Sequence, residues 1–120
     1  MPTEFRRIVF SNAELQEAIV TYPGEGKTAL GTGSVRSVRF ADEKRDRLVV
    51  GMHDALNADP QERTLATPFV AAALLRYCIT KRIPIQRSAQ KSLTVSGDNI
   101  ALDLRSASKS VEVPTAKTAV

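Results

Sequence analysis

The chain has 120 residues, of which 42% are hydrophobic and 25% charged, with a formal net charge of +4. This length and composition indicate one globular domain with a single modest core. The longest apolar run is far shorter than the ~18 residues of a membrane-spanning helix, and no signal peptide is evident, so we expect a cytoplasmic protein without a membrane partner. One histidine and one cysteine exclude an internal disulfide and leave no ligand set for zinc, so no metal and no cofactor are expected.

The N-terminal segment predicts a strand followed directly by a helix. The strand is expected to end at Phe10, with Ile8 on the same face and Val9 on the other. Ser11 and Glu14 then have the spacing of a capping box, which marks a helix start. The apolar residues of that helix recur at helical spacing and should share one buried face: Leu15, Ala18, Ile19 and Tyr22.

A glycine-rich connection over residues 23–34 follows this helix. Its Gly-Lys-Thr sequence, beginning at Gly26, is the end of a phosphate-binding loop motif. The full motif needs a glycine five positions earlier, where this chain has Thr21, and it needs a strand rather than a helix before the loop. A plain surface loop is therefore the favoured interpretation.

Two further strands are expected over residues 35–40 and 47–52, joined by a charged loop. Alternation predicts that their inward residues are Val38, Phe40, Leu48, Val50 and Met52. The polar stretch over residues 53–63 is expected to lead without regular structure into the next helix.

The central element is an apolar helix from Thr67 to Arg82, for which Thr67 is the expected N-cap. After it, residues 92–96 and 99–104 form the clearest hairpin signal in the chain, with a two-residue Gly-Asp turn. The predicted register sets Val95 opposite Ile100 and Leu93 opposite Leu102.

The expected order is therefore βαββαββ, an α+β fold built as a two-layer sandwich. Its first six elements follow the split-βαβ, ferredoxin-like order, to which the C-terminal β-hairpin is added. Residues 1–105 should form the single domain. Residues 106–120 lack periodicity and are expected to be a disordered tail.

No credible catalytic constellation is found, so we expect a non-enzymatic protein. His53 lies beside Asp54, but no nucleophile can be placed near this pair. Cys78 lies within the apolar helix and is interpreted as a core residue. The strand over residues 47–53 has no aromatic residue, so the aromatic platform of an RNA-recognition motif is not expected.

A clustered basic segment is the strongest functional signal. No acidic residue occurs between Glu62 and Asp98, while several basic ones do. We interpret part of this set as one basic edge that contacts a nucleic-acid backbone or an acidic protein surface: Arg76, Lys81, Arg82, Arg87 and Lys91. Ordinary helix-dipole complementation in a solvated segment is the competing explanation.

Two other functions remain open. Val9, Val35 and Val49 are expected opposite the core face, where exposed apolar side chains would favour homo-oligomerisation. Alternatively, a small ligand-binding domain or enzyme could use His53, Asp54 and the glycine-rich loop.

Overall fold

The computed structural model describes residues 3–31, 33–55 and 57–107. Helices and strands follow one another in this order: β1 (Thr3–Phe10), α1 (Asn12–Val20), α2 (Gly26–Ala29), β2 (Ser34–Phe40), β3 (Arg47–Asp54), β4 (Asn57–Ala66), α3 (Thr67–Thr80), β5 (Gln90–Ser96) and β6 (Asn99–Ala107). The predicted α+β class is therefore confirmed. Two elements, α2 and β4, were not expected from the sequence.

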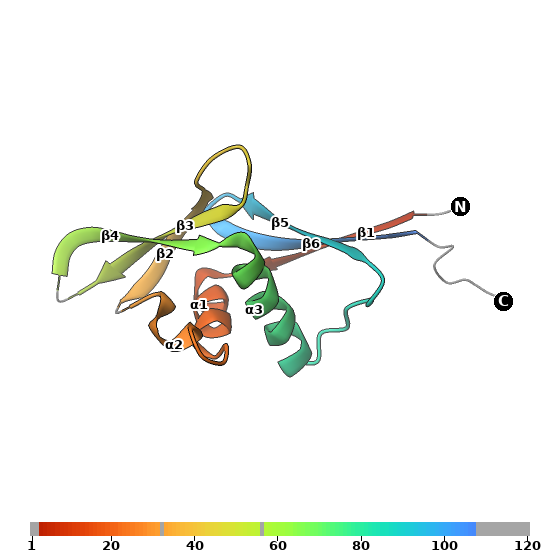
Figure 1. The fold of residues 1–120 in the computed structure, drawn as a ribbon, viewed down its shortest axis with the longest axis horizontal. Coiled ribbons are helices and arrows are strands. Elements are labelled where there is room, and N and C mark those ends of the chain that lie inside the picture. The colour runs from red at the N-terminus through yellow and green to blue at the C-terminus, as the bar shows by residue number, and fades with distance from the viewer. Residues whose placement is uncertain (1–2, 32, 56, 108–120) are drawn as a thin grey trace.

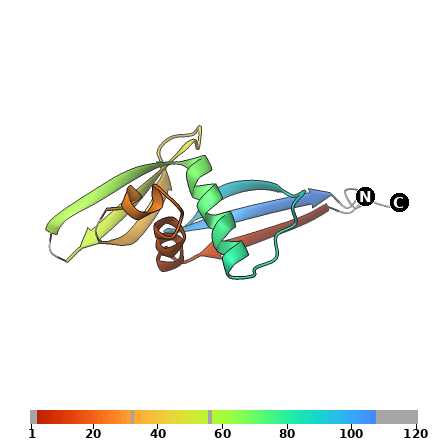
Figure 2. The same cartoon turned by 60° about the horizontal axis from the view of Figure 1, so that its bottom comes forward.

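The strands form two antiparallel sheets of three strands each, in the orders β1-β6-β5 and β2-β3-β4. Helices α1 and α3 lie on the same side of these sheets (Figure 1). Within the described residues, the opposite side of the β1-β6-β5 sheet is covered by no helix, and Figure 2 shows its strands running beyond the end of α3. We call this uncovered side of β1-β6-β5 the outer face.

Helix α1 begins as predicted. The Ser11 hydroxyl accepts a hydrogen bond from the Glu14 amide at 3.1 Å, and the Glu14 carboxylate accepts one from the Ser11 amide at 2.8 Å. This reciprocal capping box satisfies two amides that the first turn leaves without helical partners. The predicted apolar stripe is buried at Leu15, Ala18 and Ile19.

Helix α3 starts differently from the prediction. Its N-cap is Ala66, and the Thr67 hydroxyl donates instead to the Arg45 carbonyl at 2.8 Å. Thr67 is the first residue of the helix and not the residue before it, so its hydroxyl does not cap the first turn. The hydrogen bond ties the start of α3 to the loop between β2 and β3. The face of α3 turned to the core is formed by Val70, Ala73, Leu74, Tyr77 and Cys78.

The end of α3 is a Schellman motif. The Ile83 amide donates to the Cys78 carbonyl at 2.8 Å, and the Arg82 amide donates to the Ile79 carbonyl at 3.1 Å. Arg82 has a φ of 60°, the left-handed conformation that this motif requires and that glycine usually supplies.

The C-terminal hairpin is confirmed in turn and register, with Val95 opposite Ile100 and Leu93 opposite Leu102. Strand β6 is longer than predicted and reaches Ala107, because residues 100–107 also pair with β1. The rest of the predicted tail, residues 108–120, lies outside the described residues.

The ferredoxin-like arrangement is not confirmed. A split βαβ unit sets parallel strands side by side, whereas every strand pair described here is antiparallel. Strand β1 pairs with β6 rather than with β2 or β3, and β2 and β3 join β4 in the other sheet.

Candidate functional site

The predicted basic edge divides into two parts. Arg76, Lys81 and Arg82 lie on or just after the C-terminal half of α3. Arg87 and Lys91 lie at the other end of the connection to β5, where the Lys91 ammonium donates to the Arg87 carbonyl at 3.1 Å. These five residues therefore do not form one continuous row of free charges.

Two of the five residues, both lysines, already bond to other groups of the protein. The Lys81 ammonium lies 3.1 Å from the Glu17 carboxylate and 5.5 Å from the Tyr77 ring centroid. Its hydrogen bond to Glu17 raises the pKa of Lys81 above the ordinary value. The Lys91 ammonium closes a short turn by donating to the backbone carbonyls of Arg87 and Ala89. Arg76, Arg82 and Arg87 are exposed and remain the basic side chains of this set that can meet a partner.

The structure places a second set of polar and aromatic residues on the outer face. Because side chains alternate along a strand, the residues of this set come from every second position of three paired strands. They are Phe5, Arg7 and Val9 of β1; Ala101, Asp103 and Arg105 of β6; and Gln90, Ser92 and Thr94 of β5.

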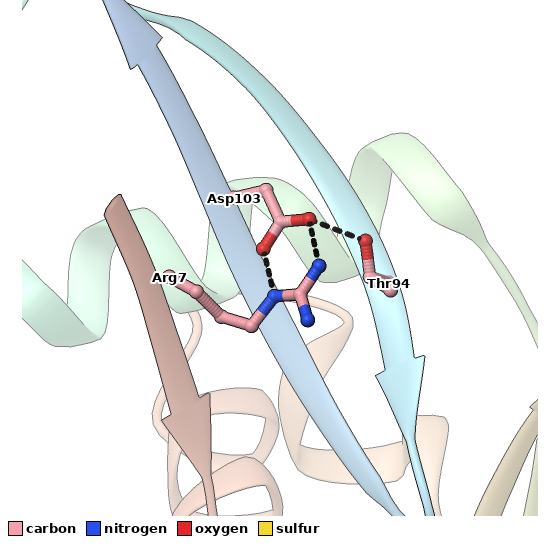
Figure 3. Close-up of polar contacts among 3 residues, drawn as sticks. All are labelled: Arg7, Thr94 and Asp103. Carbon is pink, nitrogen blue, oxygen red and sulfur yellow. Dashed lines mark hydrogen bonds and ion pairs between the residues drawn. The ribbon is translucent and has the colours of Figure 1, made fainter. Parts of the chain in front are cut away.

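Arg7, Asp103 and Thr94 form the polar centre of the outer face (Figure 3). Arg7 Nε donates to Asp103 Oδ1 at 2.7 Å, and its Nη2 donates to Oδ2 at 3.0 Å. The Thr94 hydroxyl donates to the same Oδ2 at 2.7 Å. The Asp103 side chain is buried, and the Arg7 hydrogen bond holds the pKa of its carboxyl below the usual range despite that burial.

Phe5 lies next to this polar centre and is the aromatic residue of the outer face. Its side chain is 53% exposed. The guanidinium carbons of Arg7 and Arg105 each lie 5.6 Å from its ring centroid, a cation–π distance. A depression of about 550 Å³ adjoins the ring and is lined by Phe5, Gln90, Lys91, Ser92, Asp103 and Arg105.

Sequence reasoning did not single out Phe5, Arg7 or Arg105. A signal for the first two was available, since Phe5 and Arg7 share the period-two face of Val9, which was expected to point away from the core. Arg105 shares the period-two face of Ala101 and Asp103, but only the pairing of β1 with β6 brings it opposite Phe5.

Of the three valines expected on an open sheet face, one is half exposed and two are buried. Val9 is half exposed on the outer face. Val35 is buried in the core, because a bulge between Val35 and Ser37 breaks the alternation that had placed it outside. Val49 is also buried, beside its cross-strand neighbours Arg39 and Thr64.

His53 is an exposed residue of β3. It lines a depression together with Arg36, Glu62 and Asp98. Asp54 is not among the residues that line this depression. The side chain of Lys27, from the glycine-rich loop, lies outside the described residues. The end of the glycine-rich loop lies against this strand, since Gly33 approaches the His53 carbonyl and the Asp54 side chain. A ligand site at His53 stays a prediction.

The remaining candidates are structural. Cys78 is fully buried in α3, and burial raises the pKa of its thiol. Among the described residues, no group of three or more His, Cys, Asp and Glu side chains could hold a metal ion. No helix in the described ranges is long and apolar enough to cross a membrane.

Comparison of the chain with protein-family models, with curated proteins and with solved structures finds no match.

Proposed function

We propose that the protein is a non-catalytic binding module whose outer face binds single-stranded nucleic acid. The observation that carries this proposal is the exposed Phe5 ring within 5.6 Å of the Arg7 and Arg105 guanidinium carbons. Aromatic rings and guanidinium planes on an open sheet are the surfaces on which unpaired bases stack.

Charge on the outer face suits a phosphate backbone. Arg105 contributes a positive charge with no acidic side chain bonded to it among the described residues. Arg7 shares its charge with Asp103, yet the bidentate contact holds its guanidinium in one orientation beside Phe5. A preorganised guanidinium loses less side-chain entropy when a ligand binds.

Hydrogen-bonding groups surround the ring. Gln90 and Ser92 line the same depression as Phe5, and both side chains are exposed. Amide and hydroxyl groups can bond to the edges of an unpaired base, which a duplex would hide. A single strand is therefore the nucleic acid that fits this face.

The proposal is tested by fluorescence anisotropy with one labelled oligonucleotide, single-stranded or in duplex, across a salt series. Single-strand binding should weaken with salt, with a log–log slope of about −0.7 per neutralised phosphate. Phe5→Ala should cost about 1–3 kcal/mol of single-strand affinity. Val20→Ala is the control, because Val20 is an exposed apolar residue of α1 rather than of the outer face.

A charge-matched pair completes this test. Arg105→Ala should lower the salt slope by about 0.7, whereas Arg76→Ala removes the same charge from α3 and should leave the slope unchanged. Equal effects of the two variants would mean that binding depends on net charge and not on the outer face.

Self-association through the outer face is a second candidate function. The observation that favours it is that both Phe5 and Val9 are about half exposed on this face. Light scattering at two concentrations separates the candidates. A dimer that Val9→Gln dissociates, with no oligonucleotide binding, would replace the nucleic-acid proposal.

A further inference from the structure

Helix α3 has a second apolar face, on which Leu75 is partly buried against the core and Ile79 is exposed. Ala72, Leu75 and Ile79 lie at helical spacing on the side of α3 away from its buried residues. Ile79 is 73% exposed. A helix that is apolar on two faces needs a cover on each, and within the described residues the second face stays uncovered at Ile79.

This face forms a groove of about 560 Å³. One side is α3, through Leu75, Arg76, Ile79 and Thr80, and the other is the turn after α1, through Tyr22 and Pro23. The Tyr22 ring is held in place by an edge contact to Phe69, with ring centroids 5.3 Å apart. The groove therefore has one wall fixed by aromatic packing and a floor of aliphatic side chains.

The charges at the groove are positive. Arg76 lines it, and Arg82, which is exposed but is not a lining residue, follows Ile79 by three residues at the end of the helix. No acidic side chain of the described residues lines the groove. The nearby carboxylates of α1 are already used, since Glu17 is paired with Lys81 and Glu14 belongs to the capping box.

We propose that this groove docks an amphipathic helix of an acidic partner protein. The partner's apolar stripe would pack on Leu75 and Ile79, and its carboxylates would meet Arg76 and Arg82. This assignment gives a function to the α3 part of the basic segment, and it is independent of nucleic-acid binding at the outer face.

A second copy of this chain is a poorer occupant. Two α3 helices packed about a two-fold axis through the groove would bring Arg76 of each copy towards the other, because such an interface is the same patch on both sides. Like charges in contact oppose binding. The charge of the groove therefore selects an acidic partner over self-association.

The test uses two synthetic helical peptides with one leucine stripe, flanked by glutamates in the first and by lysines in the second. Labelled peptides are titrated with the full chain in anisotropy, and amide chemical shifts locate the contact. The glutamate peptide should bind with shifts along residues 72–82, and the lysine peptide should not bind. Ile79→Gln should raise the dissociation constant about tenfold or more, and Arg76→Ala should raise it too.

Val9→Gln is the matched control, because it makes the same kind of change at a half-exposed valine of the outer face. It should leave peptide affinity unchanged, as should Phe5→Ala. The proposal is overturned if the glutamate peptide does not bind, if both peptides bind equally, or if the shifts fall on β1 and β6. A dimer of the chain that Ile79→Gln dissociates would overturn it as well.

Discussion

Arg7 and Asp103 meet across neighbouring strands through two parallel hydrogen bonds of 2.7 and 3.0 Å. The carboxylate is buried, and its second oxygen also accepts from the Thr94 hydroxyl. The Asp103 carboxylate of β6 therefore links a side chain of β1 to one of β5. Protonation of Asp103 would weaken both links, which makes the outer face sensitive to acid.

The first prediction concerns acid. The pKa of Asp103 is lowered from its ordinary value of 3.8, chiefly by the Arg7 hydrogen bond. A lowered folded-state pKa means that the carboxylate stabilises the fold above about pH 4 and that this stability is lost as pH falls through the folded value. Asp103→Asn should therefore lose less free energy of unfolding than wild type between neutral pH and about pH 3, measured by urea denaturation. Asp98→Asn, an exposed turn carboxylate, should behave as wild type.

The second prediction concerns the end of α3. Arg82→Gly should raise the free energy of unfolding by about 0.5–1 kcal/mol, because glycine adopts the left-handed conformation without a steric penalty. Arg76→Gly, at an exposed position inside the same helix, should instead lower it by about 1 kcal/mol. Opposite signs in thermal or urea unfolding confirm the motif, and a loss in both variants would contradict it.

The third prediction separates the two apolar faces of α3. Leu74 is fully buried, so Leu74→Ala should lower the free energy of unfolding by about 2–5 kcal/mol. Ile79 is exposed in the isolated chain, so Ile79→Ala should change it by no more than about 0.5 kcal/mol. A large loss in the second variant would show that the groove is already covered in the isolated chain, which would contradict the open groove seen here.

Local signals predicted the elements whose structure depends on local contacts. The hairpin of β5 and β6 was correct in register because a two-residue turn and two alternating strands specify the same pairing. The capping box at Ser11 and Glu14 was also correct, since both of its hydrogen bonds form within one turn.

Strand β4 was missed because it does not resemble a buried strand. It contains Pro60, and among its described side chains Leu65 is the buried hydrophobic one. It lies at the edge of its sheet, where proline and polar residues are tolerated. Its pairing with β3 is a tertiary effect that overrides a weak local preference.

The pairing of β1 with β6 could not be predicted for the same reason. These strands lie at the two ends of the described chain, with Arg7 opposite Asp103 and Phe5 opposite Arg105. No local pattern specifies such a pairing. The grouping of Phe5, Arg7 and Arg105 on the outer face was consequently missed, although Val9 was expected there. The basic residues of α3 and of the segment after it were visible from composition alone.

The most direct test of the outer face uses tryptophan fluorescence, because the chain has no tryptophan of its own. Phe5→Trp places one reporter on the outer face, and Ile79→Trp places one on α3 as the control. Addition of a single-stranded oligonucleotide should quench the tryptophan at position 5 through base stacking and leave the one at position 79 unchanged. Quenching at position 79 alone, or at neither position, would contradict the proposal that this face binds nucleic acid.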